Sequence, residues 1–334
     1  MVERDMQEPE TTETRKSFKL RMSQVSKLTL IRRIIQLFVI IFLNAVFWGG
    51  VFSTDLSFFT SLFRYVPFLS SPRSTFSDSG GFLEIMLGSF MAQIVPLFLL
   101  GLVIIISIII GRSTCGWMCP AGFIQDIFGW AGEVTNNSRQ VSVTSHPFLS
   151  RVKNWILGLL LLFTIPAAFI TDKPTYTLYL QTLGDFGKNP LGFWSLDEFF
   201  FVFVPKITNE LAVDQNLDYL TNNWLVIIQG LFYLIVIILA FYFPRSYCRY
   251  LCPYGALVRP FAKHSIVALA RNPTKCVGRK ECGECELACP MQIRILDEPY
   301  AKISGNGECI LCGRCKDACD KKQYGAIELS FFKS

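Results

Sequence analysis

The sequence predicts an α-helical membrane protein with a small cysteine-rich α+β domain at its C-terminal end. Three observations support this fold class. Of the 334 residues, 51% are hydrophobic, which is too apolar for an ordinary soluble domain. Four apolar stretches are long enough to cross a bilayer, which takes about 20 residues each. The 12 cysteines follow short, regular spacings that are typical of metal binding rather than of disulfides.

The four predicted transmembrane helices cover about 34–53, 82–110, 154–171 and 224–243. The second stretch is long and contains Pro96, so a kink or a strong tilt is expected there. The predicted domains are a basic tail at 1–33, a four-helix membrane domain at 34–255, and the cysteine-rich domain at 256–334.

The distribution of positive charge predicts the orientation in the membrane. Of the 32 lysines and arginines, 27 lie in the segments 1–33, 111–153 and 244–334. Positive residues favour the cytoplasmic side, so both termini and all cysteines are expected in the cytoplasm of a prokaryotic cell, at its inner membrane. That compartment is reducing and keeps thiolates available for metal. The net charge of +6 thus follows membrane topology, and we expect lipid contact but no nucleic-acid partner.

An internal repeat links the two halves of the predicted membrane domain. The segment RSTCGWMCPAG at 112–122 follows the second span, and RSYCRYLCPYG at 245–255 follows the fourth. We therefore expect two parallel copies of a two-helix unit, each ending in a C-x3-C-P motif.

The C-terminal domain carries the strongest motif. Its last four cysteines are spaced C-x2-C-x2-C-x3-C. Three cysteines in such a run can hold one cuboidal cluster, and the fourth reaches a neighbouring cluster, as in bacterial two-cluster ferredoxins. This predicts two 4Fe–4S clusters, one on Cys276, Cys282, Cys285 and Cys319, the other on Cys309, Cys312, Cys315 and Cys289. A pair of four-cysteine zinc sites is the alternative, but zinc does not require this interleaved order.

The C-x3-C-P motifs supply Cys115 and Cys119 in one copy, and Cys248 and Cys252 in the other. One motif has too few ligands for a cuboidal cluster, so we expect all four to share a third iron–sulfur or related metal site. The alternatives are two separate two-cysteine sites, a redox-active thiol pair, or buried packing cysteines.

Two further features of the sequence bear on the cofactors. Arg112 and Arg245 precede the motifs, either as positive-inside anchors or as compensation for an anionic thiolate cluster. The two histidines, His146 and His264, lie outside the predicted spans, so no haem is expected.

The paired motifs GRSTCGWMCP and PRSYCRYLCPYGAL, together with the C-terminal cysteine run, resemble the NapH/NosR/CcoG group of membrane polyferredoxins over about residues 30–330. The layout is most similar to the NapH type, the ferredoxin subunit of a quinol dehydrogenase. The resemblance implies electron transfer from the quinone pool, through cytoplasmic clusters, to another iron–sulfur protein or a cytochrome.

If quinol is the donor, Trp117 and Tyr250, with Arg112 and Arg245, are candidate residues of its site, although the two aromatic residues are equally suited to anchoring at the membrane interface. Two other functions remain open. The CcoG type implies a cupric reductase that assists oxidase assembly, with the same cofactors. A membrane redox sensor would need an output domain, and none is visible.

Overall fold

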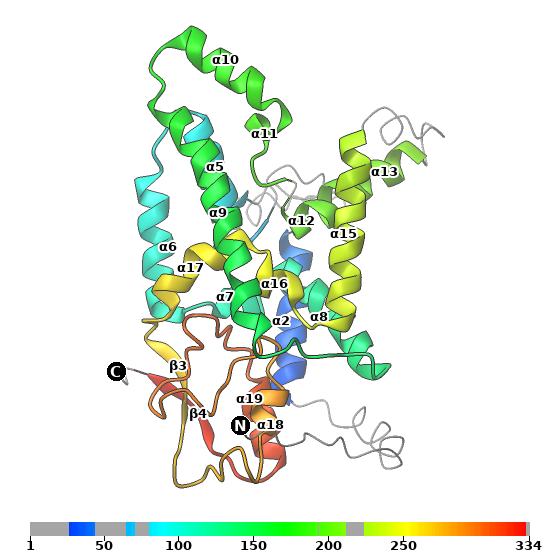
Figure 1. The fold of residues 1–334 in the computed structure, drawn as a ribbon, viewed down its shortest axis with the longest axis vertical. Helices are drawn as coiled ribbons and strands as arrows, with labels where there is room; N and C mark the ends of the chain where they lie inside the picture. Colours follow the sequence, from blue (N-terminus) through cyan, green and yellow to red (C-terminus); the bar gives the residue numbers. More distant parts are fainter. Residues whose placement is uncertain (1–26, 44–64, 71–79, 193, 212–223, 332–334) are drawn as a thin grey trace, which may run out of the picture.

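The computed structural model describes residues 27–43, 65–70, 80–192, 194–211 and 224–331. Figure 1 shows helices in the upper and middle parts and the cysteine-rich C-terminal part below them. The helices are α2 (Lys27–Leu43), α5 (Phe82–Met91), α6 (Leu97–Ile110), α7 (Ser113–Trp117), α8 (Pro120–Val134), α9 (Ser145–Phe169), α10 (Lys173–Leu183), α11 (Asp185–Lys188), α12 (Leu196–Glu198), η1 (Phe199–Phe203, a π-helix), α13 (Val204–Asn209), α15 (Trp224–Tyr242), α16 (Ser246–Tyr250), α17 (Pro253–Ala262), α18 (Glu284–Leu287) and α19 (Arg314–Lys321).

Four full membrane-spanning helices are not found in the described residues. Only α9 is long and apolar enough to cross a bilayer, while Phe82–Met91, Leu97–Ile110 and Val226–Tyr242 are shorter apolar helices. The first predicted span is described only as far as Leu43, within α2, and its remainder lies outside the described residues. One of the four predicted spans thus corresponds to a helix long and apolar enough to cross a bilayer, and the four-span arrangement stays a prediction.

The predicted second span is two helices rather than one kinked helix. α5 ends at Met91 and α6 begins at Leu97, and the two helices contact each other. Pro96 explains the break, because it has no N–H to donate and its ring excludes helical geometry from the residue before it. Gln93, at φ +62°, takes the left-handed conformation that redirects the chain.

The predicted third span begins earlier than expected. α9 starts at Ser145, not near 154, so His146 lies in its first turn and Lys153 within it. His146 was expected outside the predicted spans. The structure places it inside α9, so this expectation is wrong. A search for apolar stretches does not find the first turns of α9, because their side chains are polar although their backbone is helical.

The internal repeat has the same local structure in both copies. Each motif begins in a five-residue helix, α7 or α16, whose third residue is the first cysteine. The second cysteine of each motif is the N-cap of the following helix, with the motif's proline at the first helical position. Proline favours that position, because its missing N–H would have no helical partner there.

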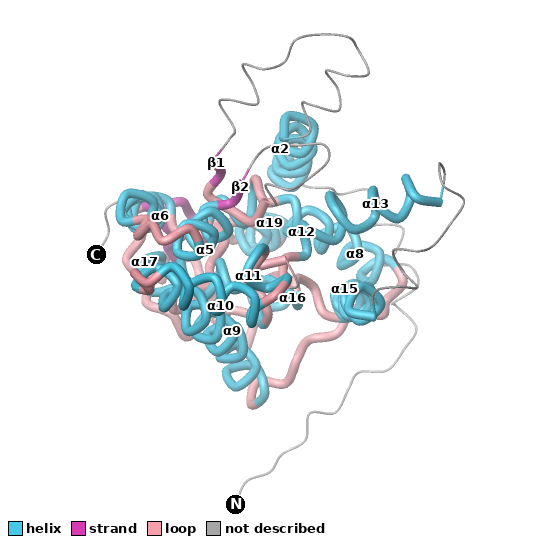
Figure 2. The backbone as a smooth tube through the Cα atoms, turned by 90° about the horizontal axis from the view of Figure 1, so that it is seen from above, coloured by secondary structure: helices cyan, strands magenta, loops and turns pink. Residues whose placement is uncertain are grey.

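The two copies exchange their packing partners. α8, after the first motif, packs on α15 of the second copy, and α17, after the second motif, packs on α6 of the first copy. Figure 2 shows these two pairs on opposite sides of the molecule. A side chain at Gly132 would lie only 1.9 Å from the Phe241 carbonyl oxygen, so glycine permits the close approach of α8 to α15. This exchange brings the two motifs face to face.

The C-terminal part is a small α+β unit. Strands β3 (Val267–Arg271) and β4 (Ile327–Phe331) pair antiparallel, and α18 and α19 pack together beside them. The predicted boundary at 255/256 falls inside α17, which continues to Ala262 and packs on α6 and α9. A second sheet, of β1 (Tyr65–Val66) and β2 (Gly80–Gly81), lies in the helical part.

Candidate metal centres

Eight cysteines of the C-terminal part line two cavities. We call them the inner cavity, which lies against the helical part, and the outer cavity. The inner cavity is lined by Cys289, Cys309, Cys312 and Cys315, with Leu, Ile and Met side chains. The outer cavity is lined by Cys276, Cys282, Cys285 and Cys319. The thiols are thus grouped in the two sets of four that the spacing predicts.

The two short helices explain why the sets interleave along the chain. Cys285 lies in α18 and Cys289 just after it, while Cys315 and Cys319 both lie in α19. Residues four apart on a helix lie on one face, one turn apart. α19 therefore supplies one thiol to each cavity, α18 and the turn after it supply another to each, and the two cavities are neighbours.

The donors around the cavities suit an anionic cluster. The N–H of Ala326 donates to Cys319 Sγ at 3.3 Å, and the N–H of Ile293 donates to Cys289 Sγ at 3.5 Å. Four thiols, apolar walls and N–H donors to sulfur are the surroundings that iron–sulfur clusters use. Among the described residues, no three or more His, Cys, Asp or Glu side chains converge closely enough to bind a single metal ion.

Burial controls the protonation of the inner thiols. It raises the pKa of Cys289 to about 11 and that of Cys309 to about 12. These free thiols therefore hold their protons at neutral pH, and a metal has to displace them on binding. A cluster in this cavity would supply the charge that makes four buried thiolates tolerable.

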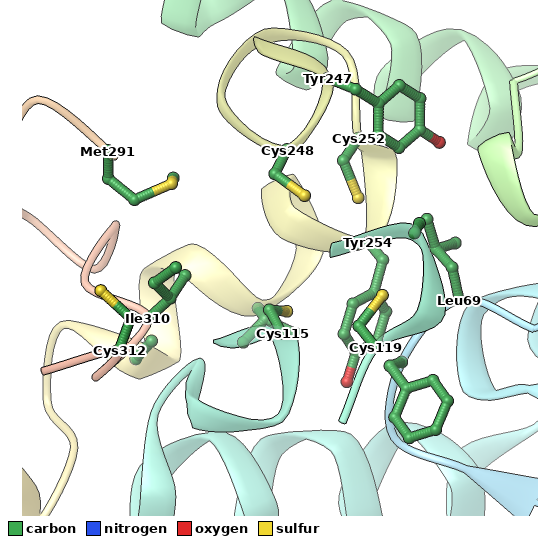
Figure 3. Packing of buried hydrophobic residues seen from close by; sticks show 14 of the residues in the cluster. Leu69, Cys115, Cys119, Tyr247, Cys248, Cys252, Tyr254, Met291, Ile310 and Cys312 are labelled. Carbon is green, nitrogen blue, oxygen red and sulfur yellow. The ribbon is translucent and has the colours of Figure 1, made fainter. Parts of the chain in front are cut away.

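The cysteines of the two C-x3-C-P motifs lie in one buried region, although no three of them come close enough to bind a single metal ion. Figure 3 shows Cys115, Cys119, Cys248 and Cys252 gathered between the two copies. All four are buried, at 5% exposure or less. Burial first, and then the charges of Cys115 and Cys248, raise the pKa of both Cys119 and Cys252. We call this group the motif centre.

Local structure points donors at the motif centre. As the N-cap of α17, Cys252 accepts the Gly255 N–H at 3.4 Å. A helix N-terminus favours negative charge, so this contact offsets part of the cost of burying a thiolate here. Gln125, one turn into α8, donates its Nε2 to Cys248 Sγ at 3.1 Å, across to the other copy.

Arg112 and Arg245 are buried, at 1% and 0% exposure, so neither is a surface anchor. Arg245 donates to Asp126 through Nε at 2.8 Å and Nη2 at 2.6 Å, and Arg112 donates to Glu308. Burial alone lowers the pKa of Arg245, but its pair with Asp126 raises it above the ordinary value. Both arginines are therefore charged groups beside the motif centre.

The first motif lies directly against the loop 309–312, which lines the inner cavity. We call this segment the cluster loop of the inner cavity. A Cβ at Gly116 would lie 2.3 Å from the Ile310 carbonyl oxygen, and Trp117 Nε1 donates to the Leu311 carbonyl at 2.9 Å. Figure 3 shows Ile310 between Cys115 and Cys312. The motif centre and the inner cavity are thus separated by about one layer of packed residues.

The aromatic residues expected near quinol make contacts of another kind. Trp117 donates a hydrogen bond to the cluster loop of the inner cavity. Tyr250 is buried, and its hydroxyl accepts from Arg249 Nη2 at 2.5 Å and lies 2.9 Å from His146 Nδ1. Neither residue lines the inner or outer cavity. In the described structure they connect elements around the centres, and their part in a quinol site stays a prediction.

Sequence reasoning missed the charged partners of the two arginines. Asp126, Glu308 and Lys153 are buried and ion-paired. One signal could have revealed them. Asp126 stands seven residues after Cys119, where the second copy has Arg259, so the repeat reverses charge at this position. Glu308 directly precedes Cys309, but nothing in the sequence shows that it reaches Arg112.

Comparison with known proteins defines the class. A 4Fe-4S binding domain family matches residues 92–135 and 225–272, the two segments that contain the C-x3-C-P motifs. The same family thus covers both copies of the repeat, and the matched segments do not include the C-terminal cysteines. No solved structure significantly matches the chain. The chain is an iron–sulfur protein of the electron-transfer type.

Its relatives narrow this class. The protein MJ0749 of Methanocaldococcus jannaschii is 29% identical over 69% of this chain and 68% of its own length. Protein NirI of Paracoccus denitrificans is 28% identical over 62% of this chain but only 24% of its own length. The ferredoxin-type protein NapH of Escherichia coli is 22% identical over 88% of this chain and 87% of its own length. These matches, though low in identity, confirm the resemblance to NapH-type polyferredoxins.

Proposed function

We propose that the protein carries electrons one at a time through three iron–sulfur centres in series. The first is the motif centre, held by Cys115, Cys119, Cys248 and Cys252, and the next two are 4Fe–4S clusters in the inner and outer cavities. The contact of Gly116 with Ile310 carries this proposal, because it sets the motif centre against the inner cavity. The paired helices α18 and α19 then connect the inner cavity to the outer one.

The residues of each site have defined roles. When bound, a 4Fe–4S cluster accepts or donates a single electron, at a potential set by its surroundings. The cysteines hold the cluster, the backbone N–H groups stabilise their sulfurs, and the Ile, Leu and Met walls of the inner cavity exclude water. Several side chains that line the outer cavity are partly exposed, among them Cys276, Cys282 and Tyr324, which suits an exit to a partner redox protein.

We further propose that the helical part is embedded in the cytoplasmic membrane and takes electrons from quinol. Large apolar side chains are exposed along α2, α6, α9 and α15, including Phe98 at 84%, Trp155 at 78% and Leu231 at 54%. An apolar surface of this extent on a soluble monomer would be an aggregation liability, whereas lipid would cover it. The similarity to the ferredoxin-type protein NapH supports quinone interaction and a redox partner in general, and we propose quinol as the donor and an iron–sulfur protein or cytochrome as the acceptor.

The proposal is tested by anaerobic purification from membranes, with iron and sulfide analysis, followed by mixing with a quinol analogue. We expect about twelve irons per chain, three separable EPR signals on reduction, and reduction by the quinol. Stoichiometric zinc without iron would refute the cluster assignment. Failure of quinol to reduce an iron-loaded protein, together with rapid oxidation of the reduced protein by Cu²⁺, would favour a metal reductase instead.

A further inference from the structure

Two buried charge clusters flank the motif centre, one on each side. In the Asp126 cluster, the carboxylate lies 2.6 Å from Arg245, 3.1 Å from Arg33 and 3.4 Å from Arg32. α2 supplies two of these arginines, and the second motif supplies the third.

In the Glu308 cluster, the carboxylate contacts Arg112, lies 2.5 Å from Lys153 Nζ and lies 3.2 Å from Arg259 Nε. The cations come from the first motif, α9 and α17, while the acid comes from the cluster loop of the inner cavity. Each cluster therefore contains three cations for one carboxylate.

This excess of positive charge needs compensation. Arg32, Arg112, Arg245 and Lys153 are all at 1% exposure or less. Burying unpaired charge is costly. Besides Glu308, the groups near Arg112 that could carry negative charge are the motif thiols, once a bound metal displaces their protons. Burial lowers the pKa of Arg112, but Glu308, and then the three thiols Cys115, Cys252 and Cys248, raise it above the ordinary value. An anionic motif centre would balance the excess.

Each arginine serves the opposite copy of the repeat. The guanidinium of Arg245 lies over Gly122, where a Cβ would be 3.4 Å from Nη2, and the guanidinium of Arg112 lies over Gly255, where a Cβ would be 2.5 Å away. Arg245 Nη1 also donates to the Cys115 carbonyl at 3.2 Å. The glycine of each C-P-x-G segment thus leaves space for the arginine of the other copy.

The backbone of Arg245 shows that this arrangement is specific. It has φ +55°, in the left-handed region that non-glycine residues seldom adopt. Such a conformation is strained and persists when surrounding contacts fix it. The two-pronged pair with Asp126 supplies those contacts.

We propose that the Asp126 and Glu308 clusters set the reduction potential of the motif centre, with Arg112 and Arg245 as positioning residues that each act across the repeat. This inference rests on the proposed function, since it requires a redox centre on the four motif cysteines. A nearby buried positive charge stabilises the more negative, reduced state and so raises the potential. A nearby carboxylate has the opposite effect.

The test is a redox titration of the iron-loaded protein, followed by EPR of the motif centre, in two variants of one ion pair. Arg112→Gln removes a cation and should lower the midpoint potential. Glu308→Gln removes the acid and should raise it. We expect each to shift the electron equilibrium at least tenfold, which is about 59 mV for a one-electron couple. Loss of packing alone would not give shifts of opposite sign.

Matched controls separate charge from structure. Arg151→Gln, at an exposed position of α9 two residues from Lys153, should leave the potential unchanged. Arg112→Lys keeps the charge and should keep the potential within a few-fold of the wild-type equilibrium. If Arg112→Gln does not retain the centre, the pair Arg245→Gln and Asp126→Asn makes the same comparison on the other side.

Different outcomes overturn different conclusions. A wild-type protein that retains the ferredoxin signals but shows no third centre refutes the shared motif centre of the proposed function. If the third centre is present but its potential shifts in the same direction in both variants, or in neither, then the charge clusters do not set that potential. A fall in midpoint potential that is as large in Arg112→Lys as in Arg112→Gln leads to the same conclusion.

Discussion

Replacing Gly116 by alanine tests the contact on which the electron path depends. Gly116 lies between Cys115 and Trp117, against the backbone of Ile310 in the inner cluster loop. The added methyl group introduces no charge and removes no metal ligand. Its only direct effect is on the distance between the two loops.

The structure gives the size of this effect. The new Cβ would be 2.3 Å from the Ile310 carbonyl oxygen, whereas ordinary contacts begin at 3.4 Å, so the loops must separate by about the 1.1 Å difference. Overpacking of this kind costs about 1–3 kcal/mol, equivalent to a 5- to 150-fold smaller population of the closed contact. The Trp117 hydrogen bond to Leu311 would weaken with the same movement.

The assay compares wild type, Gly116→Ala and a control, Gly158→Ala. Gly158 is in α9, and nothing beyond its own helix backbone lies within 4 Å of the point that an added Cβ would occupy. Alanine there should be neutral or stabilising by about 0.4–1 kcal/mol. In Gly116→Ala, we expect full iron content, weaker EPR coupling between the reduced motif centre and the inner cluster, and slower electron arrival in the ferredoxin clusters. Coupling and rates equal to those of Gly158→Ala would show that this contact does not carry the electron.

Three further predictions address the ligands and the topology. Cys115→Ser and Cys252→Ser should each abolish the same signal, and the double variant should be no worse, because residues that act as a unit are non-additive; additive losses would mean separate sites. Cys312→Ala should lose about one cluster by iron count and EPR while the outer one survives. Accessibility tags near residue 135 should report the cytoplasm and tags near 190 the outside, and a reversed pair would show that the spans are miscounted.

Several features of the fold could not be predicted from hydropathy. The 82–110 stretch is continuously apolar apart from a few residues, so its composition does not distinguish one tilted helix from the pair α5 and α6. Pro96 indicated a kink, but the reversal also depends on Gln93 and on packing between the two helices. The start of α9 could not be predicted from hydropathy either, because its first turns are polar. They bury Lys153 against Glu308, an acid from a distant segment.

The grouping of the C-terminal cysteines could be predicted from their spacing alone. Short spacings on α18 and α19 fix which thiols can reach one cavity, because the geometry of one helical turn is local. The repeat was equally readable, since its two copies share the cysteines, the proline and the glycine at the same offsets.

How these units fit together depends on the packing of distant segments. The exchange of α8 and α17 between copies brings the two motifs into one buried region, and it carries each arginine to the opposite motif. Asp126 and Glu308 stand 119 and 196 residues from the arginines they bind. No local pattern encodes such pairs, because their free energy comes from burial, and burial exists only once the chain has packed.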